Sequence, residues 1–394
     1  MKSIRLLGLI WLVGLISLTG SASAQSLPLS DSATAYVITC GPGNDFYTTF
    51  GHSAIRITDS TRGIDYVYNY GTFDFDTPHF YLKFAKGKLD YCLSRTRFEN
   101  FLAVYDWERR WVSEQRLNFT TQEVNNLFVM LEWNYLPENR YYRYDLVKDN
   151  CATRVRDMVM IAPSHREVQI DWMHDGDYSY RYFLHSCMDN SLEWWRLGVD
   201  LLLGLPTDKK CSTVENMFLP VEMEKRFAGA AGTSLLVKDN QEEELVDDPV
   251  ALLQDTREPL HRSFPPVVVF ALLLALVSIL SWKNIWPRWT DTILFIVAGL
   301  VGCFLVFMWF GTDHWCTKWN LNILWASPLL ILIAIVYKKS PVWALWLQEA
   351  CFFVAAVWVV VCGLTPALLP IILTLALRVA CLIPRKPRQR QRQR

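Results

Sequence analysis

The chain has no excess of charge of either sign. Its 394 residues carry 39 Lys and Arg against 39 Asp and Glu, so the formal net charge is zero. It also lacks Cys and His residues at the spacing typical of a zinc site. Without a broad basic field, the composition does not argue for nucleic acid as a partner. The sequence therefore predicts no metal, no cofactor and no nucleic-acid partner.

The chain is too apolar for one soluble domain, with 52% hydrophobic residues and 17 Trp. Residues 1–24 have the pattern of a secretory signal peptide. Lys2 and Arg5 precede an apolar run, and a small-residue motif ends at Ala24. The alternative is an uncleaved signal anchor. In both cases the residues that follow are exported.

Charged residues become scarce after Phe264, and five apolar runs each approach the length that crosses a bilayer. The runs are 264–282, 291–310, 321–337, 343–362 and 366–383. They predict a membrane domain of five helices at 264–383, followed by a basic tail at 384–394.

The loop charges predict how this domain is oriented. An exported N-terminal side makes the first span run inward, so the loops 283–290 and 338–342 and the tail are cytoplasmic. These segments carry the Lys and Arg residues, whereas the loop 311–320 has one Lys and one Asp. The distribution follows the positive-inside rule. It predicts a multi-pass protein of a bacterial inner membrane with its N-terminal domain in the periplasm.

Residues 25–235 alternate strand-like and helix-like segments, which predicts an α+β domain. The acidic run "KDNQEEELVDDP" within 236–263 is typical of an exposed linker. The α+β domain contains an odd number of cysteines, so at least one thiol stays unpaired or pairs between chains. Cys187 and Cys211 are near each other in sequence and could form a disulfide.

Cys151 lies in "YDLVKDNCATRVRDMV", where a polar loop becomes a helix. Asp149 or Asn150 is a suitable N-cap. A helix N-terminus stabilises a thiolate, so we expect a lowered pKa and a nucleophilic thiol at Cys151. The alternative is a small buried side chain that only packs, which is common for free cysteine.

A nucleophilic thiol needs a base, and His52 is the best placed histidine. It follows Gly51 and opens the strand-like run "HSAIRITD", in which His52, Ala54 and Arg56 share one face. In the next strand-like run, "GIDYVYNYGTFDF", Asn69 is a candidate to orient the imidazole. The aromatic residues of that run suit a substrate groove, and we expect Tyr70 to line it.

Several motifs taken in this order resemble a known family. The strand "GPGNDFYTTFGHSAIRI" precedes the helix start "DNCATRVRDM", and "LLLGLPTDKKCSTVENMFLP" and "TDHWCTKWNLNILWASP" follow. The histidine-before-cysteine order resembles the circularly permuted papain-like (NlpC-like) fold. The whole set resembles the lipoprotein N-acyltransferase family of Bacteroides-type bacteria, over nearly all of the mature chain.

The resemblance implies a membrane-bound thiol acyltransferase in which Cys151 is the nucleophile and His52 the base. Asn69 is the candidate for the third polar residue, a position whose residue type varies among permuted enzymes. The implied donor is a phospholipid in the membrane, and the implied acceptor is the N-terminal amine of a diacylglyceryl-lipoprotein. Alternatives are a periplasmic cysteine peptidase or amidase with the same two residues, and a binding module without catalysis.

Two further segments are candidates for substrate binding. Trp194 and Trp195 lie in the dense apolar run 192–206, which is either a membrane-dipping helix or a buried core helix. His314 and Asn320 lie in the loop that is expected to face the periplasm. That loop is either an ordinary interfacial turn or, as the resemblance implies, part of a lipid or lipoprotein site.

Overall fold

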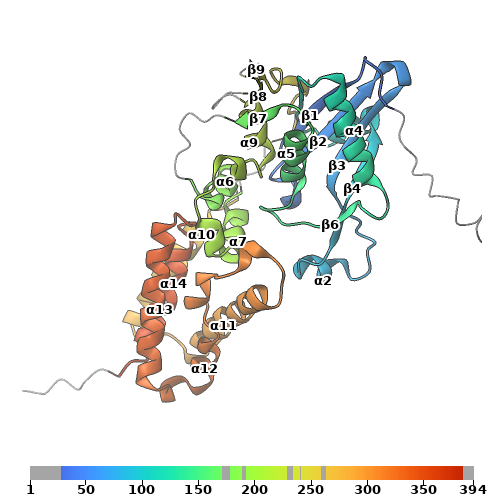
Figure 1. Ribbon diagram of the computed structural model, residues 1–394. Helices are drawn as coiled ribbons and strands as arrows, with labels where there is room; N and C mark the ends of the chain where they lie inside the picture. The colour runs from blue at the N-terminus through green and yellow to red at the C-terminus, as the bar shows by residue number, and fades with distance from the viewer. Residues whose placement is uncertain are drawn as a thin grey trace, which may run out of the picture.

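The computed structural model describes residues 28–170, 178–188, 192–228, 234–239, 241–258 and 263–384. The predicted signal peptide and basic tail therefore lie outside the described residues, apart from residue 384. Figure 1 shows a sheet-containing N-terminal domain and a C-terminal group of helices that extends away from it. The prediction of a mixed α and β domain followed by apolar helices is confirmed.

A seven-stranded antiparallel sheet forms the centre of the N-terminal domain, in the order β10-β5-β1-β2-β3-β4-β6. Its strands are β1 (Thr34–Cys40), β2 (His52–Asp59), β3 (Ile64–Thr72), β4 (Asp90–Arg97), β5 (Val112–Arg116), β6 (Tyr141–Arg143) and β10 (Val250–Leu253). The strands β1 to β4 lie next to one another in chain order, so short connections suffice for the central pairs.

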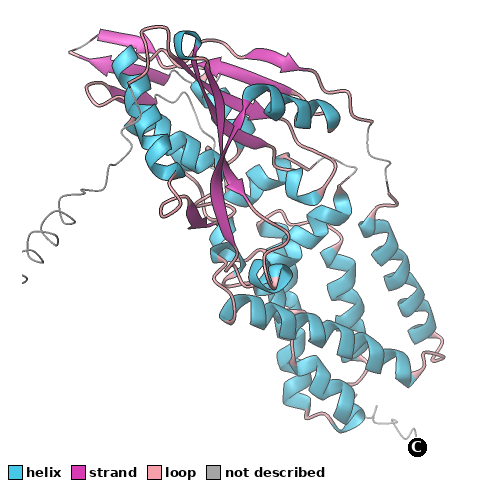
Figure 2. Ribbon diagram, turned by 90° about the vertical axis from the view of Figure 1, so that its right-hand side faces the viewer, coloured by secondary structure: helices cyan, strands magenta, loops and turns pink. Residues whose placement is uncertain are grey.

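Helices cover both faces of this sheet. On one face, Ile55 and Ile57 of β2 pack with α4 (Thr121–Tyr135) and α5 (Cys151–Ile161). On the other face, Ala54 packs in a smaller core with α3 (Phe98–Trp107). The alternation predicted for β2 is therefore confirmed. Figure 2 shows the sheet among its helices, above the helical domain.

The segment expected to be an exposed linker is largely structured. A small antiparallel sheet joins β7 (Glu167–Ile170), β8 (Ser234–Lys238) and β9 (Gln241–Glu244). Leu245 and Val246 are buried in the main core, and β10 then extends the main sheet at β5. The acidic side chains of β9 are exposed, as predicted, but the segment is not a linker, because it forms strands and buries Leu245 and Val246.

The C-terminal domain contains five α-helices at the places where the apolar runs predicted them. They are α10 (Pro266–Trp282), α11 (Arg288–Phe310), α12 (Leu329–Val336), α13 (Val342–Val361) and α14 (Leu368–Ala380). In the described residues, three segments are long and apolar enough to cross a membrane: Arg288–Phe310, Trp315–Val336 and Val342–Val361. The helices α10 and α14 are shorter, at 17 and 13 residues, so length alone does not confirm five spans.

The predicted third span, 321–337, is not one continuous helix. The 3-10 turn η4 (Trp315–Thr317) precedes it, it begins with a second 3-10 turn, η5 (Leu321–Leu324), and only α12 is α-helical. Asn322 of η5 is completely buried and donates to the backbone carbonyl of Asp200 at 2.8 Å. The irregular backbone is therefore covered by protein, as such a segment at a membrane boundary must be.

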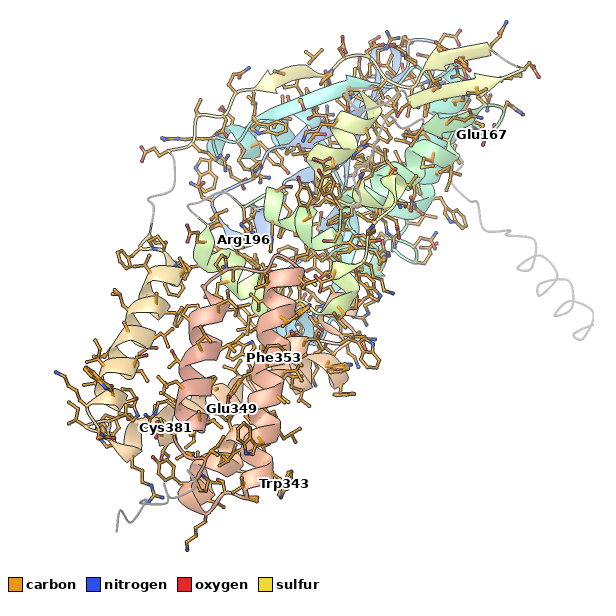
Figure 3. The ribbon with its side chains drawn as sticks, turned by 90° about the vertical axis from the view of Figure 1, so that its left-hand side faces the viewer. Glu167, Arg196, Trp343, Glu349, Phe353 and Cys381 are labelled. Atoms are coloured by element: carbon orange, nitrogen blue, oxygen red, sulfur yellow. The ribbon has the colours of Figure 1, made fainter. Side chains whose placement is uncertain are left out.

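A short helix joins the two domains. This helix, α7 (Glu193–Leu202), follows α6 (Tyr180–Ser186) and precedes the turn η3 (Leu205–Asp208). Arg196 on α7 lies between the sheet domain and the helices, while Trp343, Glu349 and Phe353 mark α13 below it (Figure 3). Val199 and Leu203 of the segment 192–206 are buried, whereas Trp194 and Trp195 are exposed, so contact of its first turn with a membrane stays a prediction.

The completely buried carboxylate of Asp200 connects both domains. Its Oδ1 accepts from Arg181 Nη1 at 2.9 Å and lies 2.8 Å from His185 Nε2. Its Oδ2 accepts from the backbone N–H of Thr365, between α13 and α14, at 2.7 Å. The side chain of Asp200 thus links α6 to the backbone between two membrane helices.

We expect Asp200→Ala to destabilise the protein by about 1–3 kcal/mol, because it leaves the buried N–H of Thr365 without a partner and Arg181 with Asp208 as its remaining carboxylate. The measurement is thermal unfolding of the full chain in detergent. Asp313→Ala is the control, since Asp313 is exposed. Equal melting temperatures for the two variants would contradict the role given to Asp200.

Candidate active site

An opening between β2 and β3 creates the candidate site. The β1–β2 pairing continues to the Cys40–His52 pair, whereas the β2–β3 pairing stops at Ile55–Tyr68. The register of β3 against β4 shifts between Asn69 and Thr72. The first turn of α5 lies against this gap, where Gly71 comes close to the Cys151 side chain.

Gly71 is required at this position. Its φ is +88°, a conformation that residues with a side chain rarely adopt. A Cβ there would lie 3.3 Å from the Tyr144 ring and 3.6 Å from Cys151 Cβ. The glycine therefore allows the strand to bulge and the helix start to approach it closely.

Asn150 fixes the start of α5. Its side-chain oxygen accepts from Thr153 N at 2.9 Å, and Thr153 Oγ1 accepts from Asn150 N at 2.8 Å, which is a capping box. Asn150 Nδ2 also donates to the carbonyls of Leu146 and Phe218. Because Asn150 is buried and bonded on all sides, Cys151 is held in one position, as the sequence predicted.

Cys151 is buried, with 6% of the residue exposed. Burial raises the pKa of the thiol, while nearby N–H groups of Ser53, Ala152 and Cys151 itself and the Tyr144 hydroxyl act to lower it. The expectation of a lowered pKa is therefore wrong in direction. Loss of hydration outweighs the helix N-terminus, so Cys151 is a thiol at neutral pH.

His52 and Asn69 come together as predicted. His52 Nε2 lies 3.3 Å from Asn69 Oδ1. Because an amide oxygen only accepts, Nε2 carries the proton and Nδ1 has the free lone pair. Within the described residues no hydrogen bond joins His52 to Cys151. Such bonds between catalytic groups often close only when substrate binds.

The imidazole is neutral at pH 7. Burial, and then the nearby charge of Arg110, lower the pKa of His52 to about 4, and the bond to Asn69 opposes them only in part. The site thus contains a neutral thiol and a neutral imidazole, instead of a thiolate and an imidazolium.

The sequence analysis missed Arg110. Its Nε donates to the carbonyl of Gly41 at 2.8 Å and its Nη1 to Glu108 at 2.7 Å, while Nη2 is buried without a partner. Arg110 precedes β5, more than fifty residues from His52 in the chain. No local pattern separates it from the other arginines, so only the strand pairing reveals it.

The sequence analysis also missed Tyr144. Its hydroxyl is directed at the Cys151 thiol, and its ring stacks on Tyr91 with the centroids 4.5 Å apart. The sequence signal that could have indicated Tyr144 is its position in the aromatic loop just before α5, the helix that begins at Cys151.

Two predicted substrate contacts are corrected by the structure. Tyr70 is 1% exposed, and its hydroxyl accepts from Asn134 in the core between β3 and α4. Asn320 is also 1% exposed, and its amide donates to the carbonyls of Leu201 and Leu202 at the end of α7. Both side chains have structural partners and face no open surface.

The other three predicted contacts are partly exposed near the domain boundary. Trp195 stacks on Phe46, in the loop between β1 and β2, with the centroids 4.9 Å apart. Trp194 Nε1 donates to the carbonyl of Phe264 at 2.9 Å, just before α10. His314 Nε2 donates to the carbonyl of Phe84 at 3.1 Å, in α2 (Phe80–Ala85). Their substrate roles remain predictions.

The cysteines that could have paired, Cys187 and Cys211, form no disulfide: the Cys211 thiol donates to the carbonyl of Tyr178 at 3.4 Å. Across the ranges that the structure describes, no group of three or more His, Cys, Asp or Glu side chains is arranged to hold a metal ion.

Comparison with family models assigns both domains. Residues 26–184 match the Lnb N-terminal periplasmic domain, and residues 258–388 match the Lnb transmembrane domain. The chain belongs to the Lnb family. The resemblance to a lipoprotein N-acyltransferase family is thereby confirmed at the level of the family. No curated protein and no solved structure matches the chain.

Family membership indicates a membrane protein of lipoprotein processing with a periplasmic N-terminal domain. The first Lnb match includes His52, Asn69 and Cys151, and the second includes His314 and Asn320. Trp194 and Trp195 lie between the two matched regions.

We expect alkylation of Cys151 by iodoacetamide to accelerate about tenfold per pH unit from neutral to alkaline pH, because only the thiolate reacts and its pKa is raised. The measurement is the rate at the Cys151 peptide by mass spectrometry. His52→Ala is the comparison and should give the same slope. A plateau beginning near about pH 5 that His52→Ala abolishes would instead indicate a thiolate–imidazolium pair.

Proposed function

We propose that this Lnb-family chain is a lipoprotein N-acyltransferase. Its Cys151 thiol accepts an acyl chain from a phospholipid and passes it to the N-terminal amine of a diacylglyceryl-lipoprotein. The observation that carries the proposal is the thiol at the capped helix start, with the N–H groups of Ser53, Ala152 and Cys151 directed at it and the neutral imidazole on the neighbouring strand residue, His52. This site belongs to a domain joined to apolar helices through Asp200.

In the first half-reaction, His52 Nδ1 takes the thiol proton as sulfur attacks the donor ester carbonyl. The N–H groups of Cys151, Ala152 and Ser53 are the donors closest to the sulfur, and they would stabilise the oxyanion. The C–O bond then breaks. The leaving lysophospholipid oxygen takes the proton from His52, and a thioester remains on Cys151.

In the second half-reaction, the lipoprotein α-amine attacks the thioester carbonyl and His52 accepts the amine proton. The C–S bond breaks, and the sulfur takes the proton back as thiol. The products are an amide and the original enzyme, so the atoms balance without a cofactor. Asn69 keeps the imidazole in the tautomer that both steps need.

Three finer features belong to the same proposal. The histidine-strand-first order suits the permuted papain-like fold. At a rise of 1.5 Å per residue, α10 is about 26 Å long, and with its flanking turns it could cross a bilayer beside α14. A multi-pass arrangement in the inner membrane would bring the site near donor and acceptor lipids.

The test is intact-mass spectrometry of a model lipoprotein from cells that lack N-acylation and express this chain. We expect the wild type to add one acyl chain to the N-terminal amine, and Cys151→Ser to add none because no thioester can form. Folded wild-type protein in the membrane that adds no mass would refute acyl transfer. Muropeptide analysis would then test a peptidase or amidase.

Asn69→Asp tests the imidazole directly. A carboxylate beside Nε2 favours the charged ring, so the pKa of His52 should rise from about 4. His52 would then be protonated at higher pH, and the acid limb of the activity profile should move to higher pH. Asn134→Asp is the matched control, since Asn134 contacts Tyr70 in the core and should leave that limb unchanged. An unmoved limb in Asn69→Asp would argue against His52 as the base.

A further inference from the structure

We propose that the donor acyl chain reaches Cys151 along a continuous line of aromatic rings that starts at α2, at the membrane boundary. This inference rests on the proposed function and extends it, because it specifies where the phospholipid enters. The path is defined by the rings of Phe84, Phe80, Phe73, Tyr91 and Tyr144.

Each ring of the path contacts the next. The centroid distances are 6.3 Å from Phe84 to Phe80, 5.8 Å from Phe80 to Phe73 and 5.4 Å from Phe73 to Tyr91. Tyr91 then stacks on Tyr144 at 4.5 Å. The Tyr144 hydroxyl is directed at the Cys151 thiol. The line therefore ends at the reacting atom.

The outer end of the path is attached to the membrane domain. The backbone N–H of Asp313 donates to the carbonyl of Lys86 at 3.0 Å, and His314 donates to the carbonyl of Phe84. Residues 313 and 314 lie in the loop after α11, which ends at Phe310. Figure 1 shows α2 at the end of the sheet domain nearest α11. These contacts place α2 where a spanning helix leaves the bilayer.

The surface of α2 is suited to that location. Tyr81 is 80% exposed, and Leu82 and Phe84 are about half exposed. Exposed aromatic and aliphatic side chains that lie together where a spanning helix leaves the bilayer are typical of a membrane interface. Lys83 and Lys88 flank them and would interact with lipid phosphates.

Aromatic side chains from the other side enclose the path. Tyr47 contacts Phe73 edge-on, with the centroids 6.3 Å apart, and its neighbour Phe46 stacks on Trp195 of α7. On the same helix, Trp194 contacts Phe270 of α10. Both sides of the path therefore connect to apolar helices of the membrane domain.

The chemistry of the path favours an acyl chain over a peptide. Ring faces offer apolar contact and few hydrogen bonds, whereas a peptide needs partners for its backbone N–H and C=O groups. Tyr91 is only partly exposed, and its ring packs against Phe73 and Tyr144, so the middle of the path presents mainly apolar ring surface. An extended hydrocarbon chain has no hydrogen bonds to water to give up, so its contact with such a surface costs the least free energy.

The experiment places the photoreactive residue p-benzoylphenylalanine at Tyr81 or at Tyr91 of the full chain. The protein is reconstituted in nanodiscs of phosphatidylethanolamine and phosphatidylglycerol. The control position is Trp133 on α4, which is 62% exposed and lies away from the membrane helices (Figure 1). After illumination, lipid adducts are measured by mass spectrometry, and N-acylation of a model lipoprotein is measured on the same preparation.

We expect phospholipid adducts at positions 81 and 91 and background levels at 133. No adduct at 91 in a protein that still N-acylates would overturn the path but leave the acyltransferase intact. Adducts at 81 and 91 without N-acylation by the unmodified chain would support lipid access and refute the proposed function. If the Tyr91 variant does not fold, Phe75 replaces it, since its exposed ring contacts Phe73 at 5.0 Å and Phe80 at 4.9 Å.

Discussion

The buried carboxylate of Asp200 is the interaction on which the arrangement of the whole molecule depends. It is completely enclosed and joins Arg181 and His185 of α6 to the backbone between α13 and α14. Burying a carboxylate is unfavourable unless every oxygen has a partner. The bonds of Asp200 are therefore retained only if α6, α7 and the membrane helices keep one relative position. That position brings α2 against the loop after α11.

Within the N-terminal domain, the constraint is the interruption between β2 and β3. A regular sheet would pair the Ser53 N–H with β3, and the cysteine helix could not reach it. The bulge before Thr72, allowed by Gly71, leaves that N–H directed at the Cys151 sulfur instead. Ser53 and His52 are adjacent, so the same break brings the thiol and the imidazole to one strand end. Gly71 thus allows α5 to pack close to β3 and leaves the Ser53 N–H available to the Cys151 sulfur.

Sequence reasoning located Cys151, His52 and Asn69 because each carries a local signal. These signals are a capped helix start, a histidine that opens a strand, and a polar residue among tyrosines. It did not foresee that the Tyr70 hydroxyl accepts from Asn134 of α4 in the core, because a strand pattern does not show which helix covers the strand. Arg110 and Tyr144 act through contacts between distant segments, which no local pattern encodes. The broken third apolar run was missed because hydropathy does not register where Asn320 and Asn322 find their partners.

The neutral state of the site is consistent with the proposed substrate. A thiolate–imidazolium pair is strongly hydrated, and an acyl chain entering beside it would have to displace that water. When the thiol has a raised pKa and the imidazole a lowered one, neither group carries a charge, so an entering hydrocarbon displaces no hydration shell of an ion there. Charge then develops only when the sulfur attacks, where the N–H groups of Ser53, Ala152 and Cys151 are already oriented toward it. Burial therefore limits competing water and still permits the reaction, because His52 can accept a proton throughout the neutral range.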